Sequence, residues 1–396
     1  MNHKHTLGGI LLALLLCGSA WAHNSKVENP APTCGFGDLR IDSDFPMGRV
    51  SECSQIGKNE YSISVKPENR PINHSAWYAF KVYAAKKRTI RIYLNYDHSP
   101  HRYPPKMSRD GRNWELLPEK NQQLLYDNKT LKLTLKVGPE PLWISGQEII
   151  SNQDHINWAD NVAARGLMQK TLLGESAEGR PIYKLESNTA ERPGYVAIVG
   201  RQHPPEVTGA LALMPFVEEV MGDSELARQF RDKFNVLVVP NLNPDGVEHG
   251  HWRHGTGGID LNRDWGPFTQ PETQLMRDEL ARFKGEDGDS LYLFLDFHST
   301  YENIFYTQPD DKKNFPQGFT KAWLEALLKR IPGFTMKRNP GHNPGLPTSR
   351  NYMHENFGVT AITYEMADKT DREEIKIIAE RAAQEMMKLL LSSYQE

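Results

Sequence analysis

Three short apolar runs in the second half of the chain place the strongest constraint on its fold. Residues 195–199, 236–239 and 291–295 have the length and composition of strands that are buried on both faces. Stretches with helical periodicity lie between and after these runs, at 206–221, 271–284, 318–329 and 372–392. The alternation predicts an α/β domain whose mixed, mostly parallel sheet is flanked by helices. Because the site of such a fold lies at the carboxyl ends of the strands, the residues after each run are the candidates for chemistry.

The first half of the chain has a different pattern. Apolar and polar residues alternate over 61–65, 89–94 and 131–137, and an aromatic-rich stretch occupies 76–83. Short strands separated by Pro, Gly and Asn clusters predict a small antiparallel β-sandwich. We therefore expect two domains, at 23–140 and 141–396, which suits a chain of 396 residues.

Residues 1–22 have the features of an export signal. Lys4 precedes an apolar stretch at 7–17, and a small-x-small cleavage site, Ala-Trp-Ala, occupies 20–22. The apolar stretch is too short to span a bilayer, which needs about 20 residues. We expect cleavage before His23, a periplasmic or secreted protein, and no transmembrane anchor. The alternative is a lipoprotein attached at Cys17, which the bulky Leu16 before it disfavours.

Two cysteines, Cys34 and Cys53, remain after that cleavage. In an oxidising compartment such a pair suggests one disulfide, and the alternative is two free thiols. Basic residues number 47 and acidic residues 50, with no run of Lys or Arg. This balance disfavours nucleic acid as a partner, because nucleic-acid binders carry a strong basic patch.

A metal site is predicted at two of the strand ends. His203 and Glu206 follow the run 195–199, and His298 follows the run 291–295. Two His and one Glu form an established ligand set for a catalytic zinc, with one position left open for water. We therefore predict one zinc ion per chain on these three residues. Asp296 is either an outer partner that orients a ligating imidazole or a solvent-facing strand end.

Further segments occur in a fixed order along the chain, at 173–183, 243–246, 252–253, 260–265 and 364–365. Together with the metal set they resemble the zinc metallocarboxypeptidases of the carboxypeptidase A and B family. The resemblance implies that family's fold and hydrolysis of the C-terminal peptide bond. It also implies that Glu365 is the general base and that Arg253 stabilises the oxyanion. Asn262 and Arg263 would hold the terminal carboxylate of the substrate.

The segment 203–206, His-Pro-Pro-Glu, is similar to the His-Pro-Gly-Glu of one branch, the cytosolic carboxypeptidases, whose members trim glutamates from protein tails. The β-rich N-terminal segment is similar to the extra domain of that branch. Two positions depart from the wider family. Pro205 replaces an Arg of the pancreatic members, so that outer substrate contact is absent, and Tyr352 is the nearest counterpart of the mobile capping tyrosine.

In this family the residue that governs side-chain preference lies shortly before the catalytic Glu, and Arg350 falls near that place. An Arg pointing into the pocket would favour a C-terminal Glu, whereas the alternative is a loop Arg that faces water. The leading prediction is thus an exported zinc carboxypeptidase that acts on peptides or protein tails. The alternatives are a cell-wall (murein) stem-peptide hydrolase of the same fold and a non-catalytic peptide-binding relative.

Overall fold

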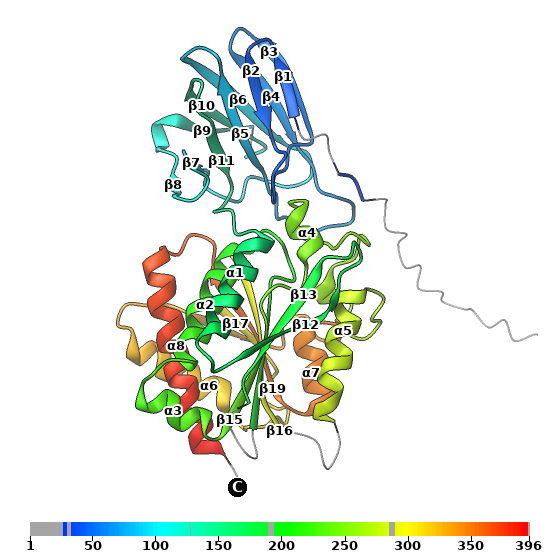
Figure 1. Ribbon diagram of the computed structural model, residues 1–396, viewed down its shortest axis with the longest axis vertical. Helices are drawn as coiled ribbons and strands as arrows, with labels where there is room; N and C mark the ends of the chain where they lie inside the picture. The colour runs from blue at the N-terminus through cyan, green and yellow to red at the C-terminus, as the bar shows by residue number, and fades with distance from the viewer. Residues whose placement is uncertain (1–26, 30–32, 127, 189–193, 285–289, 395–396) are drawn as a thin grey trace, which may run out of the picture.

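The computed structural model of the protein describes residues 27–29, 33–126, 128–188, 194–284 and 290–394. A β-sandwich occupies one end of the molecule and a larger α/β domain forms the rest (Figure 1). The expected signal peptide 1–22, with Cys17 and the cleavage site before His23, lies outside the described residues. No helix within the described ranges is long and apolar enough to cross a membrane.

Two sheets form the N-terminal domain. The first sheet contains, in spatial order, β1 (Thr33–Phe36), β2 (Leu39–Asp42), β5 (Ala79–Ala84), β11 (Leu142–Ser145), β7 (Lys106–Ser108) and β8 (Glu115–Leu116). The second contains β3 (Glu52–Gly57), β4 (Glu60–Val65), β6 (Arg88–Tyr96), β10 (Thr130–Val137) and β9 (Gln122–Leu125). The pairs are antiparallel except for β4 and β6, which run parallel. The expected sandwich is present, because alternate apolar residues of both sheets meet in one core.

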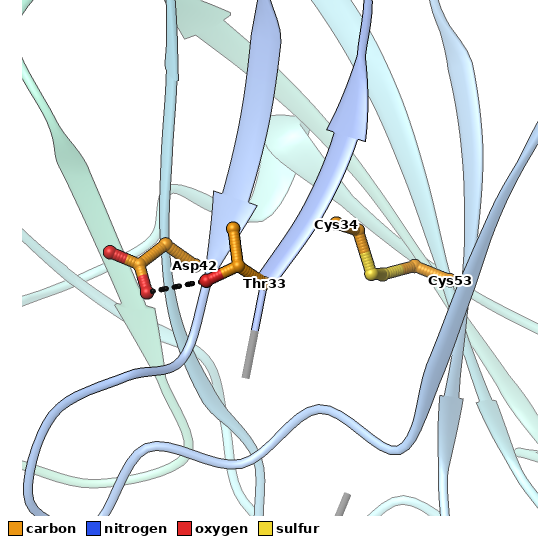
Figure 2. Close-up of a disulfide and its surroundings, with 4 residues drawn as sticks. All are labelled: Thr33, Cys34, Asp42 and Cys53. Atoms are coloured by element: carbon orange, nitrogen blue, oxygen red, sulfur yellow. Dashed lines mark hydrogen bonds between the residues drawn. A yellow bond between two sulfur atoms is a disulfide. The ribbon is translucent and has the colours of Figure 1, made fainter. Parts of the chain in front are cut away.

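A disulfide joins the two sheets of the sandwich. Cys34 lies on β1 of the first sheet and Cys53 on β3 of the second, with their Cα atoms 6.3 Å apart (Figure 2). The pairing suggested by the sequence is thereby confirmed.

An eight-stranded mixed sheet forms the centre of the second domain. Its order is β12 (Gln169–Glu175), β13 (Pro181–Glu186), β15 (Phe234–Val239), β14 (Gly194–Gly200), β16 (Ser290–Thr300), β19 (Thr360–Ala367), β17 (Ile304–Thr307) and β18 (Lys337–Pro340). The three apolar runs of the sequence are β14, β15 and the first part of β16. These strands and β19 run parallel to one another, whereas β12, β13 and β17 pair antiparallel with their neighbours toward the middle of the sheet.

Helices cover both faces of this sheet (Figure 1). One face packs against α1 (Asn152–Ala164), α2 (Val207–Val220), α3 (Glu225–Arg231), α6 (Phe319–Arg330) and α8 (Arg372–Ser393). The other packs against α5 (Pro271–Leu280) and α7 (Ser349–Phe357). The short helix α4 (Pro244–Glu248) lies beneath the sandwich. Three single-turn 3₁₀ helices complete the described elements, η1 (Glu119–Asn121), η2 (Leu261–Arg263) and η3 (Ala281–Phe283).

The two domains share a packed and hydrogen-bonded interface. Val207, Val247 and Trp252 of the α/β domain belong to the apolar core of the sandwich. β11 pairs with β5 and β7, so the N-terminal sheets continue past the expected boundary at residue 140 to Ser145. The interface matters for function because it brings part of the sandwich to the carboxyl ends of the central strands.

Candidate active site

His203, Glu206 and His298 converge at the carboxyl ends of β14 and β16. His203 lies in the loop after β14, Glu206 immediately precedes α2, and His298 lies on β16. All three side chains are buried, and their candidate ligand atoms lie within 4.8 Å of one another. Gly209 permits this convergence, because a Cβ at that position would lie 2.6 Å from the carbonyl oxygen of His298. The helix that follows Glu206 can therefore rest directly on the strand that carries His298.

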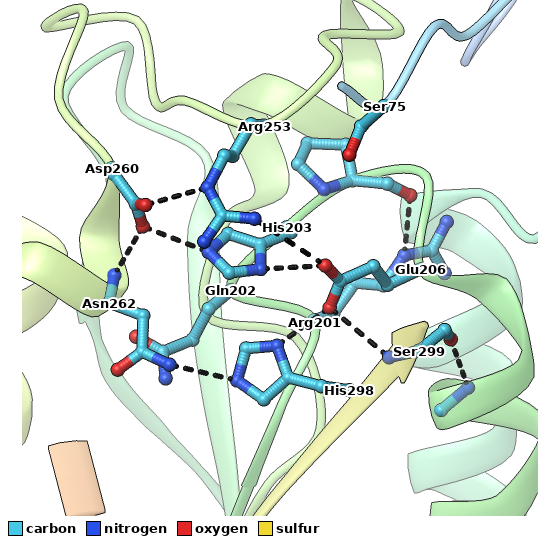
Figure 3. Close-up of polar contacts among 12 residues, drawn as sticks. Ser75, Arg201, Gln202, His203, Glu206, Arg253, Asp260, Asn262, His298 and Ser299 are labelled. Atoms are coloured by element: carbon cyan, nitrogen blue, oxygen red, sulfur yellow. Dashed lines mark hydrogen bonds and ion pairs between the residues drawn. The ribbon is translucent and has the colours of Figure 1, made fainter. Parts of the chain in front are cut away.

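Both imidazoles turn Nδ1 toward the carboxylate of Glu206 (Figure 3). His203 Nδ1 lies 2.9 Å from Oε1, and His298 Nδ1 lies 2.6 Å from Oε2. The backbone N–H of Ser299 also donates to Oε2, at 3.3 Å. One carboxylate thus lies between two ring nitrogens at the centre of the site.

The opposite nitrogen of each ring faces a second carboxylate. His203 Nε2 lies 2.9 Å from Asp260 Oδ1, and His298 Nε2 lies 2.8 Å from Asp296 Oδ2. Such acceptors hold the proton on Nε2, which directs the Nδ1 lone pairs at the Glu206 carboxylate. Lone pairs and carboxylate oxygens at these distances repel unless positive charge lies between them. The donor set therefore fits a zinc ion, which binds neutral imidazole and carboxylate.

Asp296 is fully buried, so the alternative of a solvent-facing strand end is wrong. Its Oδ2 accepts hydrogen bonds from Gln202 Nε2 at 2.7 Å and from the hydroxyl of Ser349. It lies inside β16 rather than after it, because β19 continues to pair with β16 as far as Thr300. The role of Asp260 was missed at the sequence level, because an Asp in a polar loop carries no signal of its own.

Glu365 lies on β19 directly opposite His298 in the pairing of the two parallel strands. Burial, and next the charge of Glu206, raise the pKa of Glu365 to about 8. Its Oε2 is buried and has no hydrogen-bond partner among the described residues. This carboxyl acts as a base only in its ionised form, which a cation on the nearby ligand set would favour, and its free oxygen is then suited to proton transfer.

Arg253 lies beside the cluster. Its Nε donates to Asp260 Oδ2 at 2.6 Å, and its Nη1 lies 3.8 Å from Glu206 Oε1. The guanidinium is thus held against the metal set by the same Asp260 that orients His203. This position suits the stabilisation of negative charge that develops beside the metal.

The three residues that were predicted to bind the substrate all line one cavity beside the metal set. Asn262 donates its amide N–H to Asp296 Oδ2 at 3.3 Å, and its Oδ1 accepts the backbone N–H of Ser349 at 2.8 Å. Arg263 lines the cavity beside it. Arg350 is buried in the first turn of α7 and also lines the cavity, so the alternative of a loop Arg facing water is wrong.

The cavity that unites these residues has a volume of about 460 Å³. The sandwich forms part of its wall through Ile72, Asn73, His74, Ser75 and Arg102. Arg102 Nε donates to Asp368 Oδ2 of the α/β domain at 2.9 Å. No motif in the N-terminal half of the sequence indicated this contribution.

The tyrosines of the cavity wall are Tyr301 and Tyr306. Tyr352 packs instead against Trp265 and Phe268 on the far side of α7, so it is no candidate for a capping residue. The sequence pointed to Tyr352 by its place in the chain, which does not reveal the face of a helix that meets a cavity.

Comparison with known proteins agrees with this geometry. The chain matches the zinc carboxypeptidase family over residues 155–390, which is more than half of its length. It belongs to the zinc carboxypeptidase family. Residues 41–145 match the cytosolic carboxypeptidase N-terminal domain, a range that includes β11.

Similar curated proteins include cytosolic carboxypeptidase 6 of Mus musculus, which is 23% identical over 70% of this chain and 57% of its own length. The Homo sapiens protein of the same name is 24% identical over 72% of this chain and 63% of its own length. The chain thus spans less than two thirds of either relative.

Similar solved structures cover nearly the whole fold. A metallo-carboxypeptidase from Burkholderia cenocepacia has a TM-score of 0.75 and 22% identity, over 89% of this chain and 98% of the other. A metallo-carboxypeptidase from Pseudomonas aeruginosa, in complex with (2-guanidinoethylmercapto)succinic acid, has a TM-score of 0.70 at 22% identity and the same coverage. At this identity the likeness establishes the two-domain fold.

Proposed function

We propose that the protein is a zinc-dependent carboxypeptidase that removes the C-terminal residue of peptides or protein tails. The observation that carries the proposal is the arrangement in one cavity of the His203, Glu206 and His298 set with the carboxyl group of Glu365 and the guanidinium groups of Arg253, Arg263 and Arg350. Those parts match what the reaction needs: a metal, a base, a stabiliser of negative charge and a cation for the substrate terminus.

The metal set and Glu365 would perform the hydrolysis. Zinc on the three ligands would polarise the scissile carbonyl and make a water molecule more acidic. Glu365 takes the proton of the attacking water on its free Oε2 and delivers it to the leaving amine. A positioned acid–base group of this kind contributes about 10²–10⁴-fold to the rate. A peptide-binding relative without activity would have no use for such a base.

Arg253 and Arg263 would bind the two negative charges of the reaction. Arg253, held by Asp260, is the nearest cation to the metal set and stabilises the oxyanion of the transition state. Arg263 accepts the terminal carboxylate of the substrate, for which a planar guanidinium is well suited. Asn262 lies beside Arg263 and is hydrogen-bonded to Asp296 and to the backbone N–H of Ser349 at the start of α7.

Arg350 supports a preference for C-terminal Glu. No carboxylate forms an ion pair with it within the described ranges, although it is buried. Burial, and next the like charge of Arg263, lower the pKa of Arg350 to about 10. A substrate side-chain carboxylate beside Arg350, with the terminal carboxylate on Arg263, would relieve both effects.

We also propose that the protein is exported. Residues 1–22 support this by their pattern, and the Cys34–Cys53 disulfide suits an oxidising compartment. Mass measurement of the protein recovered from a periplasmic fraction would test it, since the proposal requires His23 at the N-terminus.

The deciding experiment measures release of single amino acids from blocked peptides ending in Glu, Lys, Phe or D-Ala, with and without a chelator. The proposal expects chelator-sensitive release that is fastest for Glu. Release of D-Ala alone would point to the murein hydrolase. If zinc-loaded protein released no amino acid from any peptide, the remaining hypothesis would be a non-catalytic peptide-binding protein.

A further inference from the structure

Tyr306, on β17, leaves the central sheet on the same face as Glu365. Strands β17 and β19 pair antiparallel, with Tyr306 opposite Thr363 and Ile304 opposite Glu365. Directly opposite residues point to the same face of a sheet, and so do residues two apart on one strand. Tyr306, Thr363 and Glu365 therefore project to one side, and all three line the catalytic cavity.

The residues between them on the two strands confirm this orientation. Phe305 and Tyr364 lie opposite each other, with ring centroids 4.8 Å apart, and both belong to the core on the face covered by α6 and α8. Because neighbouring residues of a strand point to opposite faces, Tyr306 faces the other way, toward the side of the sheet where α7 carries Arg350.

The ring of Tyr306 packs on His342. The two rings are stacked, with centroids 4.1 Å apart and planes inclined by 20°. The carbonyl oxygen of His342 accepts an N–H of the Arg350 guanidinium. Gln308, two residues after Tyr306, donates its Nε2 to Arg350 O at 3.2 Å. Tyr306 and Arg350 therefore lie in the same part of the cavity wall, on either side of His342.

The hydroxyl group of Tyr306 is available to a ligand. It has no hydrogen-bond partner among the described residues, and it is not one of their buried unpaired atoms, so it is accessible from the cavity that Tyr306 lines. Burial, and next the charge of Glu365, raise the pKa of Tyr306 to about 12. The hydroxyl therefore keeps its proton at neutral pH and can donate a hydrogen bond.

Arg350 also has a donor that is available to a ligand. Its Nε and Nη2 are hydrogen-bonded to Asn351 Oδ1 and His342 O. Its Nη1 donates to no described residue and is not one of the buried unpaired atoms. This part of the cavity wall thus offers a neutral donor from Tyr306 and a charged donor from Arg350.

We propose that Tyr306 determines specificity for the C-terminal residue of the substrate, by donating a hydrogen bond from its hydroxyl to the side-chain oxygen of Glu or Gln. This inference rests on the carboxypeptidase activity proposed above and adds a second determinant to it. Arg350 discriminates by charge and favours Glu over Gln. Tyr306 discriminates by hydrogen bonding and favours both over an apolar residue of similar size such as Met, which would leave the hydroxyl without a partner.

Blocked peptides that differ only in a C-terminal Glu, Gln or Met separate the two contributions. Tyr306→Phe keeps the ring that stacks on His342 and removes only the oxygen. It should lower kcat/KM for the Glu and Gln peptides by about ten-fold, as expected for the loss of a hydrogen bond. The Met peptide cannot accept that hydrogen bond and should be affected much less. The ratio of kcat/KM for Gln over Met is therefore the deciding quantity.

Tyr352→Phe is the matched control, because it removes the same hydroxyl from a ring on the far side of α7, packed against Trp265 and Phe268. It should keep the ratio of the parent protein. The inference is overturned if Tyr306→Phe keeps that ratio too. It is also overturned if Tyr306→Phe loses activity equally on all the peptides, because the hydroxyl would then act in catalysis rather than in recognition.

A binding measurement separates this inference from the proposed activity. Calorimetry gives the dissociation constants of the same peptides for Glu365→Gln, alone and combined with Tyr306→Phe. The preference for Gln over Met should again fall about ten-fold when the hydroxyl is removed. That fall in a protein whose parent hydrolyses no peptide would overturn the proposed activity and support the recognition by Tyr306. Hydrolysis by the parent without that fall would overturn the inference alone.

Discussion

The carboxylate of Glu68, in the N-terminal sandwich, accepts the backbone N–H of Arg253 at 2.9 Å. It also accepts the N–H groups of Trp252 and His254, each at 2.7 Å. Glu68 is fully buried. Burial by itself would raise the pKa of its carboxyl group, but the charges of His251 and Arg49 hold that pKa below the ordinary value. One side chain of the sandwich thus fixes three consecutive residues, 252–254, of the loop that carries Arg253.

Replacing Glu68 by Gln should impair catalysis without removing the metal. The amide cannot accept all three N–H groups, so the free energy of unfolding should fall by about 1–3 kcal/mol. Arg253 would be less well positioned, so kcat should fall about ten-fold with little change in KM. Glu60→Gln, at an exposed ion pair of the same domain, is the matched control. Kinetics and zinc content indistinguishable from the parent protein would contradict the role of Glu68.

Glu365→Gln should retain zinc but lose turnover by about 10²–10⁴-fold, because the amide cannot accept the proton of the attacking water. Zinc content by mass spectrometry and single-turnover hydrolysis of a Glu-terminated peptide would check both parts. Since Glu365 is outside the proposed ligand set, a variant with full activity would remove it from the mechanism.

Asp296→Asn should weaken zinc binding by about 10–100-fold, the usual effect of losing an outer carboxylate partner of a ligating imidazole. The change removes the negative charge 2.8 Å from His298 Nε2 and leaves a neutral amide oxygen as a weaker acceptor, so the ring is held less firmly. Competition for zinc with a chromogenic chelator measures the affinity directly. An unchanged affinity would mean that the charge of Asp296 contributes nothing to holding His298.

Arg350→Ala should reduce the preference for C-terminal Glu over Gln by about 10–100-fold, as expected for the loss of a charged hydrogen bond in a buried pocket. The kcat/KM ratio for the two peptides is the measurement. Arg338→Ala is the control, because Arg338 pairs with the exposed Asp310 and does not line the cavity. Equal selectivity in the two variants would show that another residue recognises the side chain.

Acid should destabilise the protein partly through His101. Burial, and next the charge of Lys369, lower the pKa of His101 from 6.5 to about 4. Between those values the unfolded chain binds one proton more than the folded chain. The stability contributed by neutral His101 is therefore complete above about pH 6.5 and is lost as the pH falls toward about 4, at no more than about 1.4 kcal/mol per pH unit.

His101→Gln should accordingly lose less stability than the parent protein when the pH falls from about 7 to about 5. Urea unfolding of both proteins at the two pH values gives the difference. Parallel curves would mean that His101 has an ordinary pKa.

Much of the architecture follows from patterns that any fold of this chain must satisfy. A run such as 195–199 is too apolar to face water, and alternation over 131–137 can bury only one side of a strand. Both are local properties of the sequence, and the two runs form strands β14 and β10 in the structure. His203, Glu206 and His298 could also be found, because ligand chemistry demands few residue types and strand ends bring them together.

The sequence by itself was enough to predict an α/β domain after a β-sandwich, the strands that carry the site and the candidate ligand set, and it suggested the disulfide that the structure shows. Only the tertiary structure decided that Glu68 of the sandwich reaches the loop that carries Arg253, that Arg102 reaches the cavity, and that Asp260 lies behind His203. Glu68 and Arg253 are 185 residues apart in the chain. A contact at that separation depends on how two finished domains pack, and neither residue type nor local periodicity encodes which surfaces will meet.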